Sequence, residues 1–414
     1  MAQTNKLKIF NDPIYGFIGT PNEFIYNLIG HPYFQRLRRI SQMGMSYLVY
    51  PGAHHTRFHH ALGSMHLMRQ AIEVLRYKKV AISSEEENAL LCAILLHDIG
   101  HGPFSHALEE KIYLGNSHEK ISLGFMKSLN DSLGGGMDMA IAIFEGNYRK
   151  PFMNELISSQ LDMDRLDYLK RDSFYTGVTE GNINSERLIT MLNVADGHLV
   201  VEEKGIYAVE KFLMARRFMY WQVYLHKTSL VAELLLIKVV ERVKSLLKAG
   251  SDISCSEPLL YFLKQDGPVP LNEDLLKKFA FLDDVDVLSA IKRWQFHDDE
   301  VLSRLCKMLL NRKLLKIKIR NKPAKEGKVA EKQKWVAENY GVSDEESGYF
   351  VFSGKIDNKT YDLEHQNINI LKKNSTIIDV AKASDHLALQ AFSKTTTKYY
   401  LCYPKASVSE LNLR

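Results

Sequence analysis

Three histidines and an aspartate fall within the ten residues His97-Asp98-Ile99-Gly100-His101-Gly102-Pro103-Phe104-Ser105-His106. Imidazole beside carboxylate makes a mixed nitrogen and oxygen site, which suits Fe, Mn, Zn, Ni or Co better than Ca. The residues before His97 are apolar at helical spacing, and the glycines and proline after it would end that helix. We therefore expect a carboxylate at the end of a buried helix, where it must be paired or bound to metal. One such dipeptide alone is more often a core histidine beside a capping aspartate.

Two predicted helices would carry these groups. The serines and glutamates at residues 83–87 predict the start of the first, with a capping box from Ser84 to Glu87. A histidine-rich stretch leads into the second helix, so His60 is expected near its start. Two such helices side by side could bring His60 to the same ion as the His97-Asp98 pair.

A second acidic cluster lies at residues 162–172. On a helix, residues three or four apart share a side, which groups Asp164 with Asp167 or Tyr168 and with Arg171 or Asp172. Taken alone, the segment is more typical of a surface helix held by ion pairs. The alternative is that Asp164 is another ligand of the same ion.

A long helix is predicted from about residue 208 to residue 247. Within it, Arg216, Tyr220 and Tyr224 recur every four residues and form one stripe. The stripe is either an aromatic part of the core with arginine at its edge, or a clamp for phosphate and sugar. The second reading draws on the fork that a guanidinium presents to phosphate oxygens.

Residues 33–43, after the break at His31-Pro32, are also predicted to be helical. The basic residues Arg36, Arg38 and Arg39 cannot all lie on the apolar side of that helix. We therefore expect them on a solvated face.

The bulk composition indicates a globular protein of about two domains. The 414 residues are 45% hydrophobic, 25% charged and 10% aromatic. No apolar run approaches transmembrane length and residues 1–6 do not resemble a signal peptide, so we expect a cytoplasmic protein without a membrane partner. The four cysteines form no CxxC pair, which fits a reduced compartment. A net charge of +5 does not by itself imply a nucleic-acid partner.

The expected fold is mainly α-helical, with one small hairpin and a smaller C-terminal α+β lobe. Asp196-Gly197 marks the turn of the hairpin at residues 194–201, and residues 251–311 continue as helices. Residues 312–334 then hold ten lysines and arginines against two glutamates. Short β runs follow at residues 315–319, 349–352, 368–371, 376–380 and 398–403, which predict a lobe from about residue 311 to 414.

The order of His60, His97-Asp98 and Asp164 resembles the HD-domain metal-dependent phosphohydrolases. Longer blocks resemble the deoxynucleoside triphosphate (dNTP) triphosphohydrolases of that superfamily, whose best-known animal member carries a sterile-alpha-motif domain that we do not expect in this sequence. These blocks are residues 8–13, 34–38, 51–53, 57–63, 97–106 and 162–168. The resemblance covers about residues 6–250. It implies an HD phosphohydrolase domain at residues 1–310, followed by a lobe at 311–414 with an oligomerisation or regulatory role.

The resemblance also implies roles for single residues. It makes four residues the ligands of a divalent metal ion, with Mg accompanying the triphosphate: His60, His97, Asp98 and Asp164. It places three histidines on the catalytic and phosphate side: His101, His106 and His118. It assigns phosphate binding to Arg57, Arg165 and Arg216, and the deoxyribose and base to Gln42, Tyr168, Asp172, Tyr220 and Tyr224.

The implied reaction is metal-dependent hydrolysis of a dNTP to a deoxynucleoside and inorganic triphosphate. The departing 5′-oxygen needs a proton, and a histidine suits that task because its pKa lies near neutrality. His106 is the first choice for this donor, with Glu109 as its orienter, and His118 is the second. An aromatic ring against the sugar C2′ would exclude ribose by a steric clash.

The resemblance further implies regulation by assembly. Lys8, Gln35 and Arg38 match members of a site that binds an activating nucleotide between subunits of a tetramer. Gly30 replaces the acidic residue that would read a guanine edge, so constitutive activity or another activator is expected. A homo-oligomer, either a dimer or a tetramer, is the expected assembly.

Two other readings stay open. One is an HD hydrolase that acts on another nucleotide or on nucleic-acid ends. The other is a nucleotide or nucleic-acid sensor with weak catalysis, to which the basic run at residues 312–334 lends modest support. All four expected metal-ligand positions are intact, which argues against a site that has lost its catalytic activity.

Overall fold

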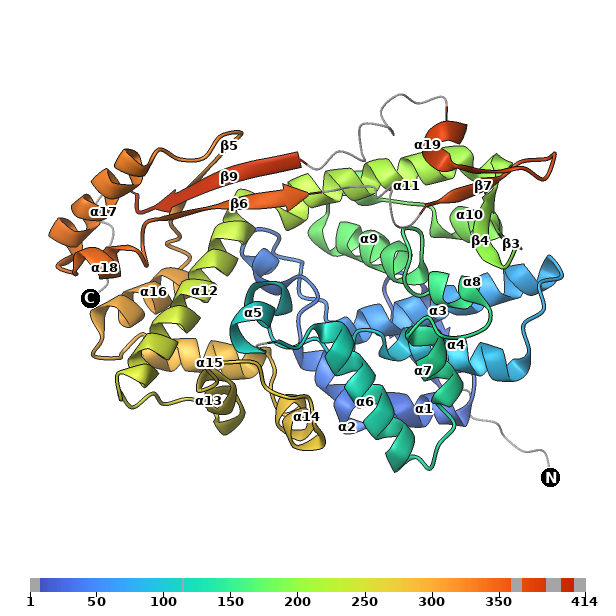
Figure 1. The fold of residues 1–414 in the computed structure, drawn as a ribbon, viewed down its shortest axis with the longest axis horizontal. Helices are drawn as coiled ribbons and strands as arrows, with labels where there is room; N and C mark the ends of the chain where they lie inside the picture. The colour runs from blue at the N-terminus through green and yellow to red at the C-terminus, as the bar shows by residue number, and fades with distance from the viewer. Residues whose placement is uncertain (1–7, 114, 359–366, 385–395, 406–414) are drawn as a thin grey trace.

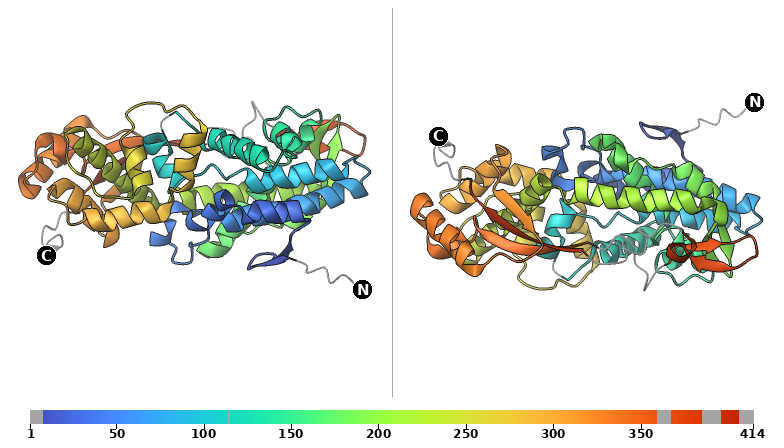
Figure 2. Two further views of the ribbon diagram at one scale, coloured as in Figure 1. Left: turned by 90° about the horizontal axis from the view of Figure 1, so that it is seen from below. Right: turned by 90° about the horizontal axis from the view of Figure 1, so that it is seen from above.

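The computed structural model describes residues 8–113, 115–358, 367–384 and 396–405, apart from the side chains of Ser105, His106 and Asn358. The molecule is long and flat, with helical layers at one end and a mixed lobe at the other (Figures 1 and 2). Among these residues, no helix has the length and apolar character that a membrane span requires. The predicted class, mainly helical with small sheets, is confirmed.

Three helices form the centre of the helical part: α3 (Arg57–Tyr77), α4 (Ser84–Leu96) and α9 (Met163–Thr176). Helix α3 packs against both α4 and α9, and α4 is apolar and buried on almost every side because it lies between neighbouring helices. Its capping box joins Ser83 to Glu86, one residue earlier than predicted. The choice is decided by Lys150 and Tyr148, which bind the carboxylate of Glu86 from another part of the fold.

The other helices surround this centre and extend it toward the lobe. They are α1 (Glu23–Gly30), α2 (Pro32–Gln35), α5 (Ser105–Ile112), α6 (His118–Ser132), α7 (Asp138–Phe144), α8 (Pro151–Glu155), α10 (Ser185–Thr190), α13 (Glu257–Leu263), α14 (Glu273–Ala280), α15 (Asp284–Trp294) and α16 (Glu300–Leu310). Short 3₁₀ turns lie at η1 (Arg36–Arg39), η2 (Gly44–Leu48), η3 (Thr179–Gly181) and η4 (Glu203–Gly205). The helical prediction for residues 251–311 is confirmed.

The predicted helix at residues 33–43 was wrong beyond its first turn, because α2 passes into η1 and the chain is extended at Ile40. The solvated face was wrong for Arg36, which is fully buried. Its guanidinium donates to the carbonyl oxygens of Ile99 at 2.8 Å, His101 at 2.9 Å and Leu282 at 3.1 Å. Burial lowers its pKa to about 10, which leaves it charged at neutral pH. Arg36 thus connects the segment after His97-Asp98, at residues 99–101, to the segment between α14 and α15.

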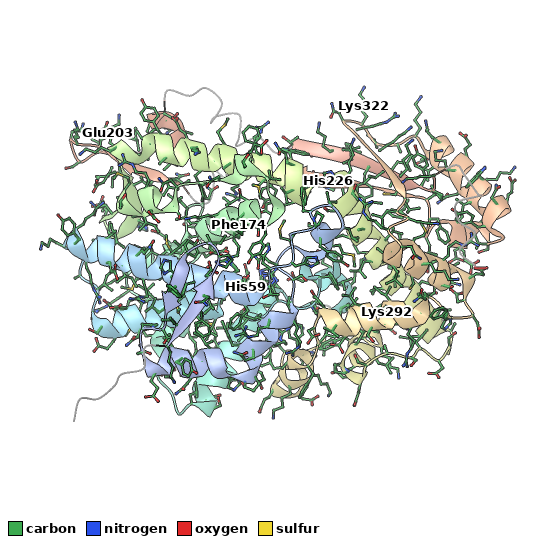
Figure 3. The ribbon with its side chains drawn as sticks, turned by 180° about the vertical axis from the view of Figure 1, so that it is seen from behind. His59, Phe174, Glu203, His226, Lys292 and Lys322 are labelled. Carbon is green, nitrogen blue, oxygen red and sulfur yellow. The ribbon has the colours of Figure 1, made fainter. Side chains whose placement is uncertain are left out.

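The predicted helix at residues 208–247 is two helices, α11 (Ile206–Met219) and α12 (Lys227–Lys248). A π-helical turn at Tyr220–Tyr224 ends the first, and His226 is extended and caps the second through the N–H of Thr228. The helix axis changes direction at this bend (Figure 1), where Figure 3 labels His226. The bend places the aromatic stripe beside α9.

The strands form three small sheets. β1 (Ile9–Asp12) and β2 (Gly16–Gly19) are a separate hairpin. The predicted hairpin is confirmed as β3 (Leu192–Ala195) and β4 (His198–Glu202), with positive φ at Asp196 and Gly197 as a tight hairpin turn requires. The remaining strands lie close to their predicted positions, with one exception: the run predicted at residues 349–352 is replaced by a strand at residues 352–358. These strands are β5 (Lys316–Arg320), β6 (Phe352–Asn358), β7 (Asn369–Leu371), β8 (Ile377–Asp379) and β9 (Thr396–Tyr403).

The C-terminal strands divide between the two ends of the molecule. The sheet β5-β9-β6 lies with α17 (Glu326–Tyr340) and α18 (Asp344–Ser347) in the lobe, whereas β7, β8 and α19 (Val380–Ala383) lie at the opposite end (Figure 1). There β7 pairs in parallel with β4, in the order β3-β4-β7-β8. The division at residue 311 stays a prediction, and part of the chain beyond it completes a sheet of the helical part.

Candidate active site

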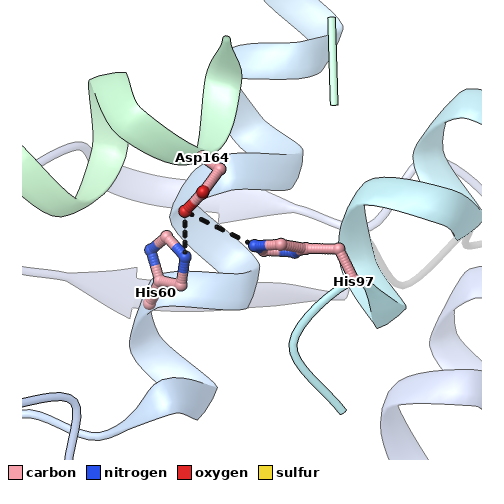
Figure 4. Close-up of side chains that lie close together, drawn as sticks. All are labelled: His60, His97 and Asp164. Atoms are coloured by element: carbon pink, nitrogen blue, oxygen red, sulfur yellow. Dashed lines mark ion pairs between the residues drawn. The ribbon is translucent and has the colours of Figure 1, made fainter. Parts of the chain in front are cut away.

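Three side chains from three helices meet at one point. His60 lies in the first turn of α3, His97 follows the last residue of α4, and Asp164 lies in the first turn of α9. Asp164 Oδ1 is 3.0 Å from His60 Nε2 and 3.5 Å from His97 Nε2 (Figure 4). The three ligand atoms lie within 4.8 Å of one another, a spacing that one metal ion can bridge.

Asp98 lies beside this trio. Its Oδ1 is 3.4 Å from His97 Nε2, and its Oδ2 is 3.7 Å from His60 Nε2. The same carboxylate accepts a hydrogen bond from Arg57 Nη1 at 2.5 Å and lies 3.3 Å from His101 Nε2. Burial would raise the pKa of Asp98, but the charges of His97 and Arg57 and a hydrogen bond from His101 hold it well below its usual range. The group is therefore an ionised carboxylate at the predicted position.

The other ring nitrogens of both histidines are held by a second layer of contacts. His60 Nδ1 lies 2.8 Å from Asp167 Oδ2, and His97 Nδ1 lies 2.7 Å from the carbonyl oxygen of Ile94. Both acceptors place a proton on Nδ1, so Nε2 is the atom of each ring that can bind a metal ion beside Asp164. Apart from the carboxylates of Asp98 and Asp164, neither buried Nε2 atom has a polar partner among the described residues. Histidines that bind metals are commonly oriented in this way.

Asp167 is itself held by a buried ion-pair chain. Arg171 contacts its two oxygens at 2.9 and 3.0 Å and reaches Asp12 Oδ2, in β1, at 2.7 Å. Asp167, Arg171 and Asp172 are all buried, so the surface reading of residues 162–172 was wrong. A linear pattern shows only that these residues are charged, and the burial comes from α3 and β1 packing over α9.

The donor set fits a divalent transition-metal ion. Burial lowers the pKa of His60, yet the adjoining carboxylates of Asp164 and Asp167 outweigh it and raise that pKa to about 10. The carboxylates thus stabilise positive charge at the point where the two Nε2 atoms converge, and a metal ion that displaces the protons there would supply that charge. Nitrogen and oxygen ligands of this kind suit Fe, Mn, Zn, Ni or Co.

Asp167→Asn is expected to weaken metal binding by about 10- to 100-fold, because it removes the negative group that orients His60. Competition with a chelator, followed by metal analysis, measures the change. Glu180→Gln, which removes an exposed carboxylate just beyond α9, is the matched control. Equal metal affinity in the Asp167 variant and the wild type would contradict this role.

Glu109 and His118 form a second pair of side chains, next to His101, which contacts Asp98. Both oxygens of Glu109 lie 3.1 Å from His118 Nδ1, and one accepts the backbone N–H of His118 at 2.7 Å. The ring of His118 stacks on His101 with 4.0 Å between centroids. Burial lowers the pKa of His118, but Glu109 outweighs it and the pKa is raised. Glu109 therefore orients His118; the side chain of His106 lies outside the described part of the chain.

Two of the three predicted phosphate-binding arginines lie beside Tyr168. Burial raises the pKa of Tyr168, while the charges of Arg165 and Arg216 both lower it. Arg165 Nε donates to the carbonyl oxygen of Ser159 at 2.5 Å. Arg216 is buried, and its Nε and Nη1 have no hydrogen-bond partner among the described residues. A buried guanidinium with unused donors is prepared for an anion.

Four of the five residues predicted for sugar and base lie where the π-helical turn, with Tyr220 and Tyr224, meets Tyr168 and Asp172 of α9. Tyr224 donates its hydroxyl to Asp172 Oδ2 at 2.6 Å, and its ring lies 5.2 Å from that of Tyr220 and 6.3 Å from that of Tyr168, between centroids. The Oε1 atom of Gln42 is buried without a hydrogen-bond partner in the described chain. These five residues therefore stay the predicted nucleoside pocket.

The predicted activator residues lie near the start of the chain. Gln35 accepts a hydrogen bond from Arg38 Nε at 2.8 Å, and Arg38 stacks over Phe58. Lys8 lies 3.4 Å from the ring centre of Tyr26. A Cβ at Gly30 would have no neighbouring atom within 4 Å. Packing therefore does not require glycine in place of the acidic residue at this position. The role of Lys8, Gln35 and Arg38 in binding an activating nucleotide stays a prediction.

Comparisons with known proteins match this geometry. A model described as HD domain matches residues 57–172, and one described as HD associated region matches residues 183–253. The uncharacterized protein YwfO of Bacillus subtilis is 36% identical over 315 residues, which are 74% of this chain and 71% of that protein. A crystal structure of a phosphohydrolase from Bacteroides thetaiotaomicron is 48% identical, has a TM-score of 0.93, and is matched over 97% of this chain and 100% of its own. The deoxynucleoside triphosphate triphosphohydrolase SAMHD1 homolog of Dictyostelium discoideum is 29% identical over 265 residues, 59% of this chain and 51% of that protein.

Proposed function

We propose that this chain, which belongs to the HD-domain phosphohydrolase family, hydrolyses dNTPs to a deoxynucleoside and inorganic triphosphate. The observation that carries the proposal is the convergence of two buried imidazole nitrogens, His60 Nε2 and His97 Nε2, on the carboxylate of Asp164. The choice of dNTP rests on the similarity to the Dictyostelium triphosphohydrolase and on the contact between the rings of Tyr224 and Tyr168, the latter four residues along α9 from Asp164.

His60, His97, Asp98 and Asp164 would hold the metal ion. When bound, the ion supplies a Lewis acid for a phosphate oxygen and lowers the pKa of a water molecule. The chain itself positions the substrate. Arg57, next to Asp98, and the buried Arg216 would bind oxygens of the triphosphate and screen their charge, which is where most catalysis of phosphoryl chemistry arises.

The departing 5′-oxygen would receive its proton from a histidine. His118 is suited to this because Glu109 fixes its ring and raises its pKa above the ordinary value, which favours the protonated ring that a general acid requires. His106 is the alternative donor from the neighbouring helix. His101, whose pKa is lowered by burial and by Arg57, would act as a neutral hydrogen-bonding group.

Tyr224→Ala is expected to reduce the preference for dNTPs over ribonucleoside triphosphates (NTPs) by about tenfold or more, because a ring held against C2′ rejects a 2′-hydroxyl by clash. The measurement is the ratio of kcat/KM for each dNTP and its matching NTP. Tyr207→Ala, an exposed tyrosine on α11, is the control. An unchanged ratio in the Tyr224 variant would remove this residue from the sugar pocket.

Product analysis tests the function directly. The chain is incubated with each dNTP and with Mn, Mg, Fe or Co, with and without a second nucleotide, and the products are separated. Tripolyphosphate with deoxynucleoside supports the proposal, whereas pyrophosphate or monophosphate assigns the site to another HD hydrolase reaction. Binding of polynucleotide with a steep salt dependence and no dNTP turnover would favour a sensor. Size-exclusion chromatography in the same mixtures tests the expected homo-oligomer.

A further inference from the structure

We propose that His55 is a positioning residue that fixes the sugar pocket, by holding Asp172 as the acceptor for the sugar hydroxyl and Tyr224 as the barrier to ribose. The inference rests on the proposed function and deepens it, because it assigns sugar selection to a residue that does not itself contact the substrate. The sequence pattern missed His55 because it stands in a run of histidines whose members look alike until α9 packs against them.

The first support is the pairing of His55 with Asp172. His55 Nε2 lies 2.7 Å from Asp172 Oδ1, while Tyr224 occupies Oδ2 at 2.6 Å. The side chains of His55 and Asp172 are almost completely buried, at 0% and 3% exposure. Since an ionised carboxylate only accepts hydrogen bonds, the proton lies on His55 Nε2. Each oxygen of Asp172 thus has one donor and keeps a lone pair for a ligand.

The second support is that His55 cannot turn. Its ring stacks on Tyr175 with centroids 4.4 Å apart and planes at 16°. The loop before it lies so close to α9 that a Cβ on Gly52 would stand 2.6 Å from the carbonyl oxygen of Tyr175. Only glycine permits that approach, and the approach keeps His55 against Tyr175 and Asp172. The donor to Asp172 is therefore rigid.

The third support is that His55 also holds the loop of Gln42. The carbonyl oxygen of His55 accepts the backbone N–H of Gln42 at 3.0 Å. Gln42 Oε1 is buried and lacks a hydrogen-bond partner within the described residues, as expected of a group that awaits a ligand. One histidine thus orients three members of the predicted nucleoside pocket: Gln42, Asp172 and Tyr224.

The chemistry of the sugar gives this arrangement a purpose. A 2′-deoxynucleoside triphosphate has one sugar hydroxyl, at C3′, and a fixed carboxylate is the natural acceptor for it. A ribose adds a second hydroxyl, which a fixed tyrosine ring would exclude. Without His55, Asp172 can rotate, and both the acceptor and the ring that it anchors lose their positions.

Three variants separate the hydrogen bond from packing. His55→Gln keeps an N–H donor, His55→Met has the same length without a donor, and His55→Phe keeps a ring to stack on Tyr175. We expect the Met and Phe variants to raise KM for dNTPs about 10- to 100-fold with a smaller change in kcat, as for a lost hydrogen bond to a charged group. The dNTP-to-NTP preference is expected to fall in parallel, and the Gln variant to recover most of both.

Dideoxynucleotides distinguish a positioning role from a merely structural one, because a structural defect would cause the same penalty with both kinds of nucleotide. A 2′,3′-dideoxynucleoside triphosphate (ddNTP) gives Asp172 no hydroxyl to accept, so the penalty of the Met and Phe variants is expected to shrink toward onefold with it. Thermal unfolding and metal content are measured for each variant. If Phe does not fold, the Gln and Met pair carries the comparison.

The outcomes distinguish the two levels of the proposal. A wild-type chain that releases triphosphate from no dNTP overturns the proposed function, and this inference with it. Normal dNTP hydrolysis with equal penalties for dNTP and ddNTP, or with unchanged KM and sugar preference in the variants, overturns the role of His55 alone. If no variant folds, equal wild-type kcat/KM for dNTP and ddNTP overturns it.

Discussion

His97→Ala is expected to abolish triphosphate release and to leave the protein without its metal ion. His97 provides one of the two buried Nε2 atoms that face Asp164, and its ring is held for that purpose by the carbonyl oxygen of Ile94. Loss of the ion removes several kcal/mol of transition-state stabilisation, which is at least about a thousandfold in rate. Metal analysis and turnover are measured on the same preparation.

His198→Ala, an exposed histidine in the β3–β4 hairpin, is the matched control and is expected to keep both metal and activity. Asp98→Ala is expected to behave like His97→Ala, and Asp98→Asn tests whether the charge or the shape of that side chain matters. Triphosphate release that persists in His97→Ala or Asp98→Ala would refute the assignment of the metal ligands.

His118→Ala is expected to lower kcat by about 10²- to 10⁴-fold while the metal content stays unchanged, as for the loss of a general acid. The pH profile makes the role specific. A histidine that donates a proton must be charged, so the rate falls as pH rises through its pKa. Glu109 raises that pKa, and Glu109→Gln should therefore move the alkaline limb of the profile to lower pH.

Glu110→Gln is a close control, since it neutralises the adjacent, exposed glutamate of the same helix. It is expected to leave the alkaline limb in place. If Glu109→Gln also leaves it in place, His118 is not the donor and the role passes to His106.

The elements that position the candidate metal site were predictable because their signals are local. The glycines and proline after His97 end α4 where expected, and the predictions of His60 near a helix start and of Asp164 on a helix are confirmed. The resemblance to HD-domain phosphohydrolases is likewise confirmed. Caps and breaks depend on a few neighbouring residues, so a linear pattern contains them.

The buried charges were not predictable in the same way. Arg36 reads as part of a basic surface, yet its partners are three backbone carbonyls that other segments deliver. Arg171 and Asp167 read as a surface ion pair, and only the arrival of His60 and Asp12 makes them buried support for the site. Whether a charged side chain is buried depends on its neighbours in the tertiary structure, and the local periodicity of the sequence does not show those neighbours.

The parallel pairing of β4 with β7 has a consequence for synthesis on the ribosome. Val201 and Glu202 of β4 can pair with Ile370 and Leu371 of β7 only after the α17 segment and the strands β5 and β6 have been synthesised. Until then a nascent chain presents the edge of β4 as a template for incorrect partners. C-terminal truncation should therefore reduce the yield of correctly folded enzyme, beyond the loss of an accessory lobe.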